Sequence, residues 1–173
     1  MRGIAKYGGF LVFALVFLLS LSLTGLPAQE KTKVAIHSEM EYTSREVKEI
    51  GDLEGHTLIL STIEGINKST GDREFMDGAK VTIFGFTDAV KGNGISQGYV
   101  NMVKDGNIVY GEFKGKVTTT MVEGKPVTVF EITGKFLKGS GIYEGIQGEF
   151  TSKAKMVTEK KMVIETEGEY SIK

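Results

Sequence analysis

The sequence predicts an all-β protein of about eight antiparallel strands, arranged as a sandwich or a barrel. Two observations lead to this fold class. Short runs rich in Val, Ile, Thr, Phe and Tyr, the residues that pleated surfaces favour, recur after residue 30 and are bounded by glycine. Helical periodicity is absent from the same region, so the elements between the glycines are strands.

The expected strands follow one another at short intervals, joined by hairpin turns. Asp105-Gly106 lies between two alternating runs and is a strong signal for a two-residue hairpin. Two further hairpins are expected at VEGKPV and TEKKMV, with Pro126 at the start of a strand, where a missing N–H does little harm. The strand-forming runs are KVAIHSEMEY, HTLILSTIEG, AKVTIFGFTDAV, GYVNMV, NIVYGEF, KPVTVFEITG, QGEFTSKAKMV and KMVIETEGEYSI.

The first 28 residues have the pattern of a secretory signal helix. Arg2 and Lys6 precede an apolar run from Phe10 to Leu23, and small and turn-forming residues follow. We predict a signal peptide over 1–28, cleaved after Ala28, and a single domain over 29–173 that is secreted or periplasmic. The alternative is an uncleaved anchor over 8–26, which would be the only contact of the protein with a membrane.

Composition excludes several classes of function. Removing Arg2 and Lys6 from the 21 basic side chains leaves 19 against 22 acidic ones, a formal charge of −3 without a basic block. Nucleic acid is therefore not an expected partner. The absence of cysteine excludes disulfides, thiol catalysis and cysteine-ligated metals, and we expect no cofactor.

The glycine-rich stretch GSGIYEGIQGEF, residues 139–150, raises the question of a phosphate-binding loop. A dinucleotide loop needs a third glycine where Glu144 stands and a helix after it, and a P-loop needs a terminal Gly-Lys-Ser/Thr. Neither pattern is present. The glycines are therefore predicted to be structural and to form a tight bend between strands; they are Gly139, Gly141, Gly145 and Gly148.

Some strands are apolar on both faces. In VTIFGFT, Val81 and Ile83 share one face while Phe84 and Phe86 share the other. Such a strand needs a core on one side and a second cover on the other, either a partner subunit or a packed terminal segment. Local irregularity is the alternative explanation.

Two groups of polar residues alternate along neighbouring segments. His37, Glu39 and Glu41 share one face of the first strand, and Asp52, Glu54 and His56 repeat the arrangement on what we expect to be the next strand. Same-face neighbours on a strand lie about 6.5–7 Å apart, so one strand cannot place three ligands on one ion. We predict no metal site and a solvated polar face instead.

The candidate ligand-binding residues are few. Tyr99 and Tyr110 flank the Asp105-Gly106 hairpin, where they either line a cavity mouth or pack on the sheet surface, and His56 is a third, weak candidate. We predict no catalytic residue; Glu39 is the weak candidate. Alternation places Glu39 opposite the apolar Ile36 and Met40, and so outside.

Together, ITG at 132–134 and GSGIYEGIQGEF resemble a motif of the allene oxide cyclase barrel-like family, and IGDLEG at 50–55 is similar to a motif near the start of the plant cyclases. The resemblance covers roughly residues 33–172. It implies an eight-stranded antiparallel barrel of the kind also found in dirigent proteins, and an oligomer, commonly a trimer.

The resemblance also implies that Glu39 matches a first-strand glutamate that assists ring closure in the cyclases. The chain departs from that pattern at Leu58, which stands in place of an asparagine, and at Glu54-Gly55, where the family has a proline. The residues of the barrel match better than the residues of the chemistry.

Three functions follow from these observations. The first is an exported barrel that binds a small hydrophobic ligand in its lumen, since a barrel of about eight strands can just hold one such molecule. The second is a cyclase or isomerase that acts on an apolar substrate. The third is a non-catalytic structural or interaction barrel with a filled lumen.

Overall fold

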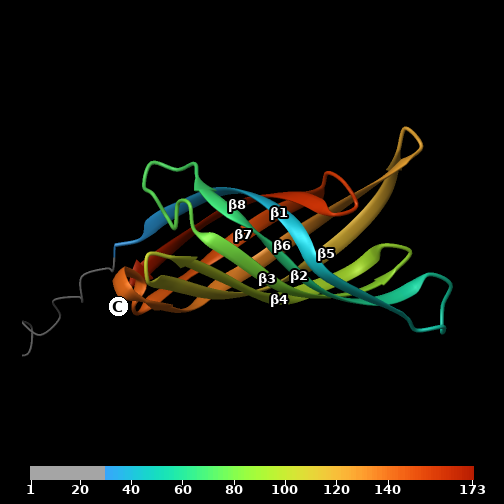
Figure 1. Cartoon of the computed structure of the whole chain (residues 1–173), viewed down its shortest axis with the longest axis horizontal. Helices are drawn as coiled ribbons and strands as arrows, with labels where there is room; N and C mark the ends of the chain where they lie inside the picture. The colour runs from blue at the N-terminus through green and yellow to red at the C-terminus, as the bar shows by residue number, and fades with distance from the viewer. Residues whose placement is uncertain (1–29) are drawn as a thin grey trace, which may run out of the picture.

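The computed structural model describes residues 30–173, and the expected signal helix and its cleavage site lie outside these residues. The described chain forms a closed barrel of eight antiparallel strands, in which each strand pairs with its sequence neighbour and β8 pairs with β1 (Figure 1). Of the two architectures that the strand pattern predicted, a sandwich and a barrel, the chain therefore forms the barrel. Its elements are β1 (Thr32–Glu49), β2 (His56–Ser69), β3 (Lys80–Val90), β4 (Asn93–Lys104), β5 (Asn107–Val122), β6 (Lys125–Ser140), η1 (Gly141–Tyr143), β7 (Ile146–Met156) and β8 (Lys161–Ile172).

Three of the connections are tight two-residue hairpins. The predicted Asp105-Gly106 turn is one of them, and both of its residues have positive φ, 50° and 77°. Lys91-Gly92 and Glu123-Gly124 repeat this pattern. Positive φ at both central positions is typical of type I′ turns, whose twist matches that of the flanking strands.

The inward faces of the strands are filled by aromatic side chains that pack over glycines. Phe113, Phe150 and Tyr170, the aromatic residues of three Gly-Glu-aromatic triplets, all pack against the core. A Cβ added to Gly134 would lie 2.2 Å from Cζ of Phe150. Glycine at this position therefore makes room for the ring inside the barrel.

The connection between β2 and β3, residues 70–79, closes one end of the barrel. Phe75 is 1% exposed, and its ring contacts those of Phe136, Tyr143 and Tyr170 at centroid distances of 5.4, 5.3 and 5.0 Å. The backbone N–H of Met76 donates to Oη of Tyr143 at 3.3 Å. We call residues 70–79 the plug, because Phe75 seals this end with apolar contacts.

The outer face of β2, β3 and β4 carries large apolar side chains. Leu60, Phe84 and Tyr99 are 57%, 52% and 59% exposed. Phe84 is paired with Tyr99 across the sheet, so two of these side chains are neighbours. The predicted apolar character of both faces therefore holds for β3, and its outer face is open in the single chain.

Among residues 30–173, no helix has the length and apolarity needed to cross a membrane.

The bend after η1 depends on Gly145. Its φ is +78°, and a Cβ at this position would lie 2.5 Å from the carbonyl oxygen of Lys173. The same glycine accepts a hydrogen bond from the backbone N–H of Lys173 at 3.2 Å. A side chain at this position would therefore be strained by the backbone conformation and would meet the backbone of Lys173.

Gly145→Val should lower the free energy of unfolding by about 1–3 kcal/mol through backbone strain and the contact with Lys173. Gly124→Val is the comparison variant: Gly124 also has positive φ, +76°, and shares the backbone strain, but nothing lies within 4 Å of an added Cβ, so it should be destabilised less than Gly145→Val. Chemical denaturation would measure the free energy of unfolding of both variants and of the parent. A Gly145→Val protein as stable as the parent that has lost ligand binding would contradict the structural role.

Candidate functional site

The lumen of the barrel contains a cavity of about 90 Å³ that is mainly apolar. Methionine and phenylalanine side chains from opposite sides of the barrel form much of its wall, among them Met40, Met102, Phe113 and Phe150. None of the lining residues, all of which lie within 30–173, is charged. The rest of the lining includes Ile36, Ile63, Val81, Ile83, Val100, Phe130, Ile132, Phe136, Ala154, Met162 and Ile164.

The polar side chains in the cavity wall bond to one another. Oγ of Ser38 donates to Oδ1 of Asn67 at 2.7 Å, and Oγ1 of Thr87 donates to Oγ of Ser96 at 3.1 Å. The hydroxyls of Ser152 and Thr166 lie 2.8 Å apart. Buried polar groups are thus satisfied within the wall. Ser96 accepts the hydrogen bond from Thr87, so its own hydroxyl group can still donate a hydrogen bond to a bound molecule.

The two ends of the lumen differ. The plug seals one end through Phe75. At the other end every residue of β1 from 43 to 49 is exposed, and the β1–β2 and β5–β6 turns diverge on the right of Figure 1. β7 ends at Met156 and β8 begins at Lys161, so the wall is lower there. We call this end the mouth.

A second hollow lies on the outer surface and is not enclosed. Its lining combines charged side chains, among them Glu112, Lys135 and Glu149, with the apolar side chains of Leu60, Phe84 and Tyr99. Nζ of Lys135 and Oε1 of Glu112 form an ion pair there at 2.8 Å. Small-molecule sites are concave and mostly apolar, so the lumen is the better candidate site.

Glu39 lies on the outer face of the barrel, where its side chain is exposed. Its strand neighbours across the sheet are Ile66 and Val163, and it does not line the cavity. The alternation of β1 predicted this outward position. His37 lies on the same face, with Nδ1 2.5 Å from Oε1 of Glu165 on β8.

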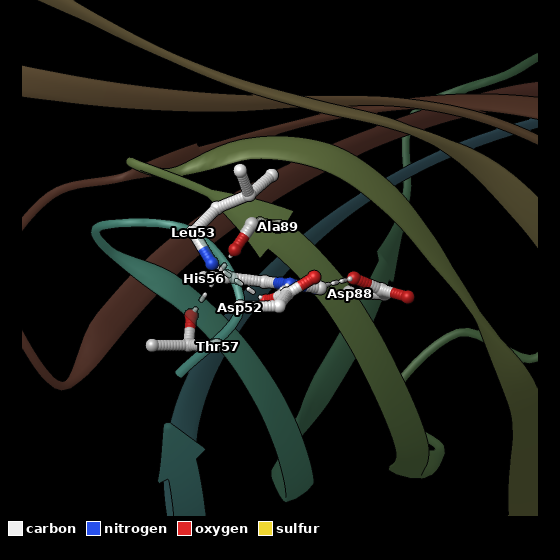
Figure 2. A network of polar contacts seen from close by, with 6 residues as sticks. All are labelled: Asp52, Leu53, His56, Thr57, Asp88 and Ala89. Atoms are coloured by element: carbon white, nitrogen blue, oxygen red, sulfur yellow. Dashed lines mark hydrogen bonds and ion pairs between the residues drawn. The ribbon is translucent and has the colours of Figure 1, made fainter. Parts of the chain in front are cut away.

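His56 is held between two carboxylates on the outer surface near the mouth (Figure 2). Nδ1 lies 2.5 Å from Oδ1 of Asp52 and Nε2 lies 2.8 Å from Oδ1 of Asp88. The hydrogen bonds to Asp88 and then to Asp52 raise the pKa of His56 above its usual value. The hydrogen bond to His56 likewise lowers the pKa of Asp52.

This trio, which we call the His56 clamp, ties two turns together. Asp52 lies in the β1–β2 turn and Asp88 near the end of β3. The backbone N–H of Lys91 donates to the carbonyl oxygen of Gly55 at 2.8 Å, and Nζ of Lys91 pairs with Glu54 at 2.8 Å. The clamp therefore fixes the β1–β2 turn against β3 at the rim of the mouth.

Asp52 and Glu54 were expected to share a strand with His56, and the structure places them in the turn that precedes β2. The Gly51 and Gly55 residues, at φ of +83° and +74°, reverse the chain around them. The carboxylates of the clamp occupy opposite edges of one imidazole and do not converge on one point. Within residues 30–173, no group of three or more His, Asp or Glu residues is arranged to hold a metal ion.

Tyr99 and Tyr110 lie on the outer face, 59% and 40% exposed. Neither belongs to the cavity lining, and His56 does not either. Both tyrosines lie on the sheet surface, and Tyr99 also borders the outer hollow. The four structural glycines border η1 and β7, and Gly139 approaches the backbone of Tyr143 so closely that an added Cβ would lie 2.1 Å from its carbonyl oxygen.

Sequence reasoning missed the plug, the clamp partner and the lumenal polar pairs. Phe75-Met76, an apolar pair within the polar segment GDREFMDG, was a usable signal for the plug. Asp88 is 32 residues from His56 in sequence, and no local pattern connects them. Asn67 belongs to a formal glycosylation sequence, but its side chain faces the lumen and is 3% exposed.

The chain was compared with protein families, curated proteins and solved structures. No family model and no curated protein matches the sequence. A solved structure, the pterocarpan synthase dirigent protein GePTS1, matches 88% of this chain and 96% of its own, with 14% sequence identity and a TM-score of 0.46. At this identity and TM-score, the closed barrel is established by the strand pairing of the chain itself.

The His56 clamp should make stability depend on pH. Because the pKa of His56 is raised in the folded state, its contribution is fully present below the pKa of an unfolded histidine, about 6.5, and is lost as pH rises through the folded value. Melting curves of His56→Gln and the parent should therefore differ most near pH 5–6 and converge at higher pH.

Asp88→Asn is the second variant in this experiment. It removes the larger cause of the shift, so the pKa of His56, followed by NMR, should fall toward the ordinary value. A His56 pKa equal in the parent and in Asp88→Asn would contradict the clamp.

Proposed function

We propose that the protein is an exported β-barrel that binds a small apolar molecule in its lumen. The observation that carries this proposal is the mainly apolar cavity inside the closed barrel, sealed at one end by Phe75 and reached from the other end. A few hydroxyl groups in an otherwise apolar wall are the composition expected of a small-molecule site.

The size of the cavity limits the ligand. Its volume of about 90 Å³ is below the roughly 300–1,000 Å³ of sites for drug-sized molecules. A dry cavity of about 150 Å³ takes up benzene. The lumen is smaller than that, so it suits a short alkyl chain as it stands and a single ring after its side chains adjust; either could be the apolar end of a longer molecule that extends through the mouth.

Methionine side chains give the cavity room to adapt. Met40, Met102 and Met162 line it from β1, β4 and β8. An unbranched thioether chain changes rotamer at little cost and makes favourable contacts with aromatic rings. A modest expansion to the size of one ring is thus available without moving the backbone, and several related ligands could be accepted.

Binding is favoured over catalysis by the chemistry of the wall. Its lining residues supply hydroxyls, one amide and the phenol of Tyr42, but no carboxylate or imidazole. Glu39, the residue that the cyclase resemblance proposes as an acid or base, faces outward. General acid–base catalysis requires a group within hydrogen-bond reach of the substrate, and Glu39 does not have this position relative to the lumen.

Self-association is a separate proposal that rests on the outer face. Leu60, Phe84 and Tyr99 form part of an exposed apolar surface over β2, β3 and β4. Contact with a second copy would remove this surface from water, at a gain of roughly 25 cal/mol per Å² of apolar area. An oligomer, such as the trimer that the family resemblance implies, would supply this cover.

Filling the cavity should weaken ligand binding. Ala154 lines the lumen, and Ala154→Leu adds three heavy atoms to it, so we expect toluene to bind at least about tenfold more weakly. The measurement is a titration followed by the ¹³C-methyl signals of the methionines. Lys153→Leu, on the outer face of the same strand, is the control. Toluene that leaves the lumenal methionine signals of the parent unchanged would favour the filled structural barrel.

Charging the outer apolar face should reduce self-association. Phe84→Glu introduces a carboxylate where Phe84 is 52% exposed, and burying that charge against another subunit would be costly. Native mass spectrometry should show the parent as an oligomer and the variant shifted to the monomer. Val157→Glu, at another exposed apolar position, should leave the assembly unchanged, and a monomeric parent would contradict the proposal.

A further inference from the structure

Arg45 is placed on the lumenal side of β1, next to the cavity. A one-residue irregularity between Tyr42 and Ser44 shifts the register of β1, after which Arg45 is paired with Ser61. Paired residues on antiparallel strands project to the same face, and Ser61 lines the cavity. The guanidinium of Arg45 lies 5.9 Å from the centroid of the Tyr42 ring, and Tyr42 also lines the cavity.

Arg45 has no acidic partner within the part of the chain that the structure describes. The ion pairs of residues 30–173 involve other cations, and nearby Lys48 pairs with Glu46 on the outer side of β1. The next carboxylate on the lumenal side of β1 is that of Glu49, four residues further along the strand and so about 13 Å away. Glu159, in the turn packed near Tyr42, forms no ion pair with Arg45 either.

The position of Tyr42 prepares this guanidinium for an anion. A cation over an aromatic face is attracted by the ring, and this contact directs Arg45 along β1 toward the cavity. Burial raises the pKa of the Tyr42 phenol, so the phenol stays protonated and can donate a hydrogen bond. Two donors of different kinds therefore border the mouth, above an apolar chamber.

We propose that Arg45 anchors the carboxylate of a ligand whose small apolar tail occupies the lumen. This inference rests on the proposed function and names its ligand class, a monocarboxylate with a tail of one ring or a short alkyl chain. The planar guanidinium presents paired N–H donors that match a carboxylate. With the other end sealed by Phe75, the tail enters first and the charged group remains at the mouth, near solvent.

The test uses two probes with the same phenylpropyl skeleton, 3-phenylpropanoate with a terminal carboxylate and 3-phenylpropan-1-ol with a neutral hydroxyl group, titrated into the purified protein at pH 7. Binding is followed by the ¹³C-methyl signals of the methionines, several of which line the lumen. We expect the parent to bind the carboxylate roughly tenfold more tightly than the alcohol, as one charge-assisted hydrogen bond provides. Arg45→Gln should remove this preference and leave binding of the alcohol unchanged.

Two further variants separate the anchor from general electrostatic attraction. Arg45→Lys should keep part of the preference, because it retains the charge without the paired donors. Lys48→Gln removes a cation from the outer side of the same strand and should keep all of it. Arg45 is exposed, so its replacement should not change the melting temperature.

The outcomes distinguish a failure of the Arg45 anchor from a failure of lumenal ligand binding. Equal affinities for both probes in the parent, or a preference that survives in Arg45→Gln, would overturn the anchor and leave lumenal binding intact. Failure of both probes and of toluene to shift the lumenal methionine signals would overturn the proposed function, and the anchor with it.

Discussion

The pairing of β1 with β8 is the interaction on which the rest of the structure depends. It runs from Thr32 opposite Tyr170 to Glu41 opposite Lys161 and joins the first and last strands of a meander. Without it, both strands would be sheet edges with unpaired N–H and C=O groups. With it, the inward faces enclose a fixed volume, and every side chain on those faces must share that volume.

Aromatic rings fill much of the enclosed volume, and they fit there because glycines face them. Phe150 lies over Gly134, and Phe113 lies 3.0 Å from the position of a Cβ on Gly98. Each ring thus lies over the neighbouring strand at the paired position, where that strand has no side chain. Where methionines and small polar residues line the wall instead, the volume is not completely filled, and the cavity remains. The same closure that stabilises the fold therefore leaves a chamber whose chemistry is mainly apolar.

Much of the fold could be predicted from the sequence because strand alternation and hairpin turns are local signals. Asp105-Gly106 marks its turn, and the alternation around Ile36 and Met40 places Glu39 outside. The lengths of the strands were less predictable: β1 continues to Glu49, seven residues beyond the expected run. Its polar second half, SREVKE, lacks the apolar alternation that a core imposes, because it extends past the buried lumen.

The candidate site was harder to predict because it is made by contacts between distant residues. Phe75 seals the lumen only through rings on β6, η1 and β8, and His56 finds Asp88 only after β2 pairs with β3. Arg45 reaches the lumenal face through the irregularity after Tyr42, which shifts the alternation by one residue. Apart from the apolar pair Phe75-Met76 within its polar segment, these relations have no local sequence signal.

The central claim is that the lumen holds an apolar cavity that a small molecule can enter, and a crystal structure determined under xenon pressure tests it most directly. Xenon enters dry apolar cavities. The account predicts a xenon site inside the barrel, in contact with Met40, Met102 or Phe113, the residues that line the cavity. A lumen that excludes xenon because side chains fill it would contradict the account.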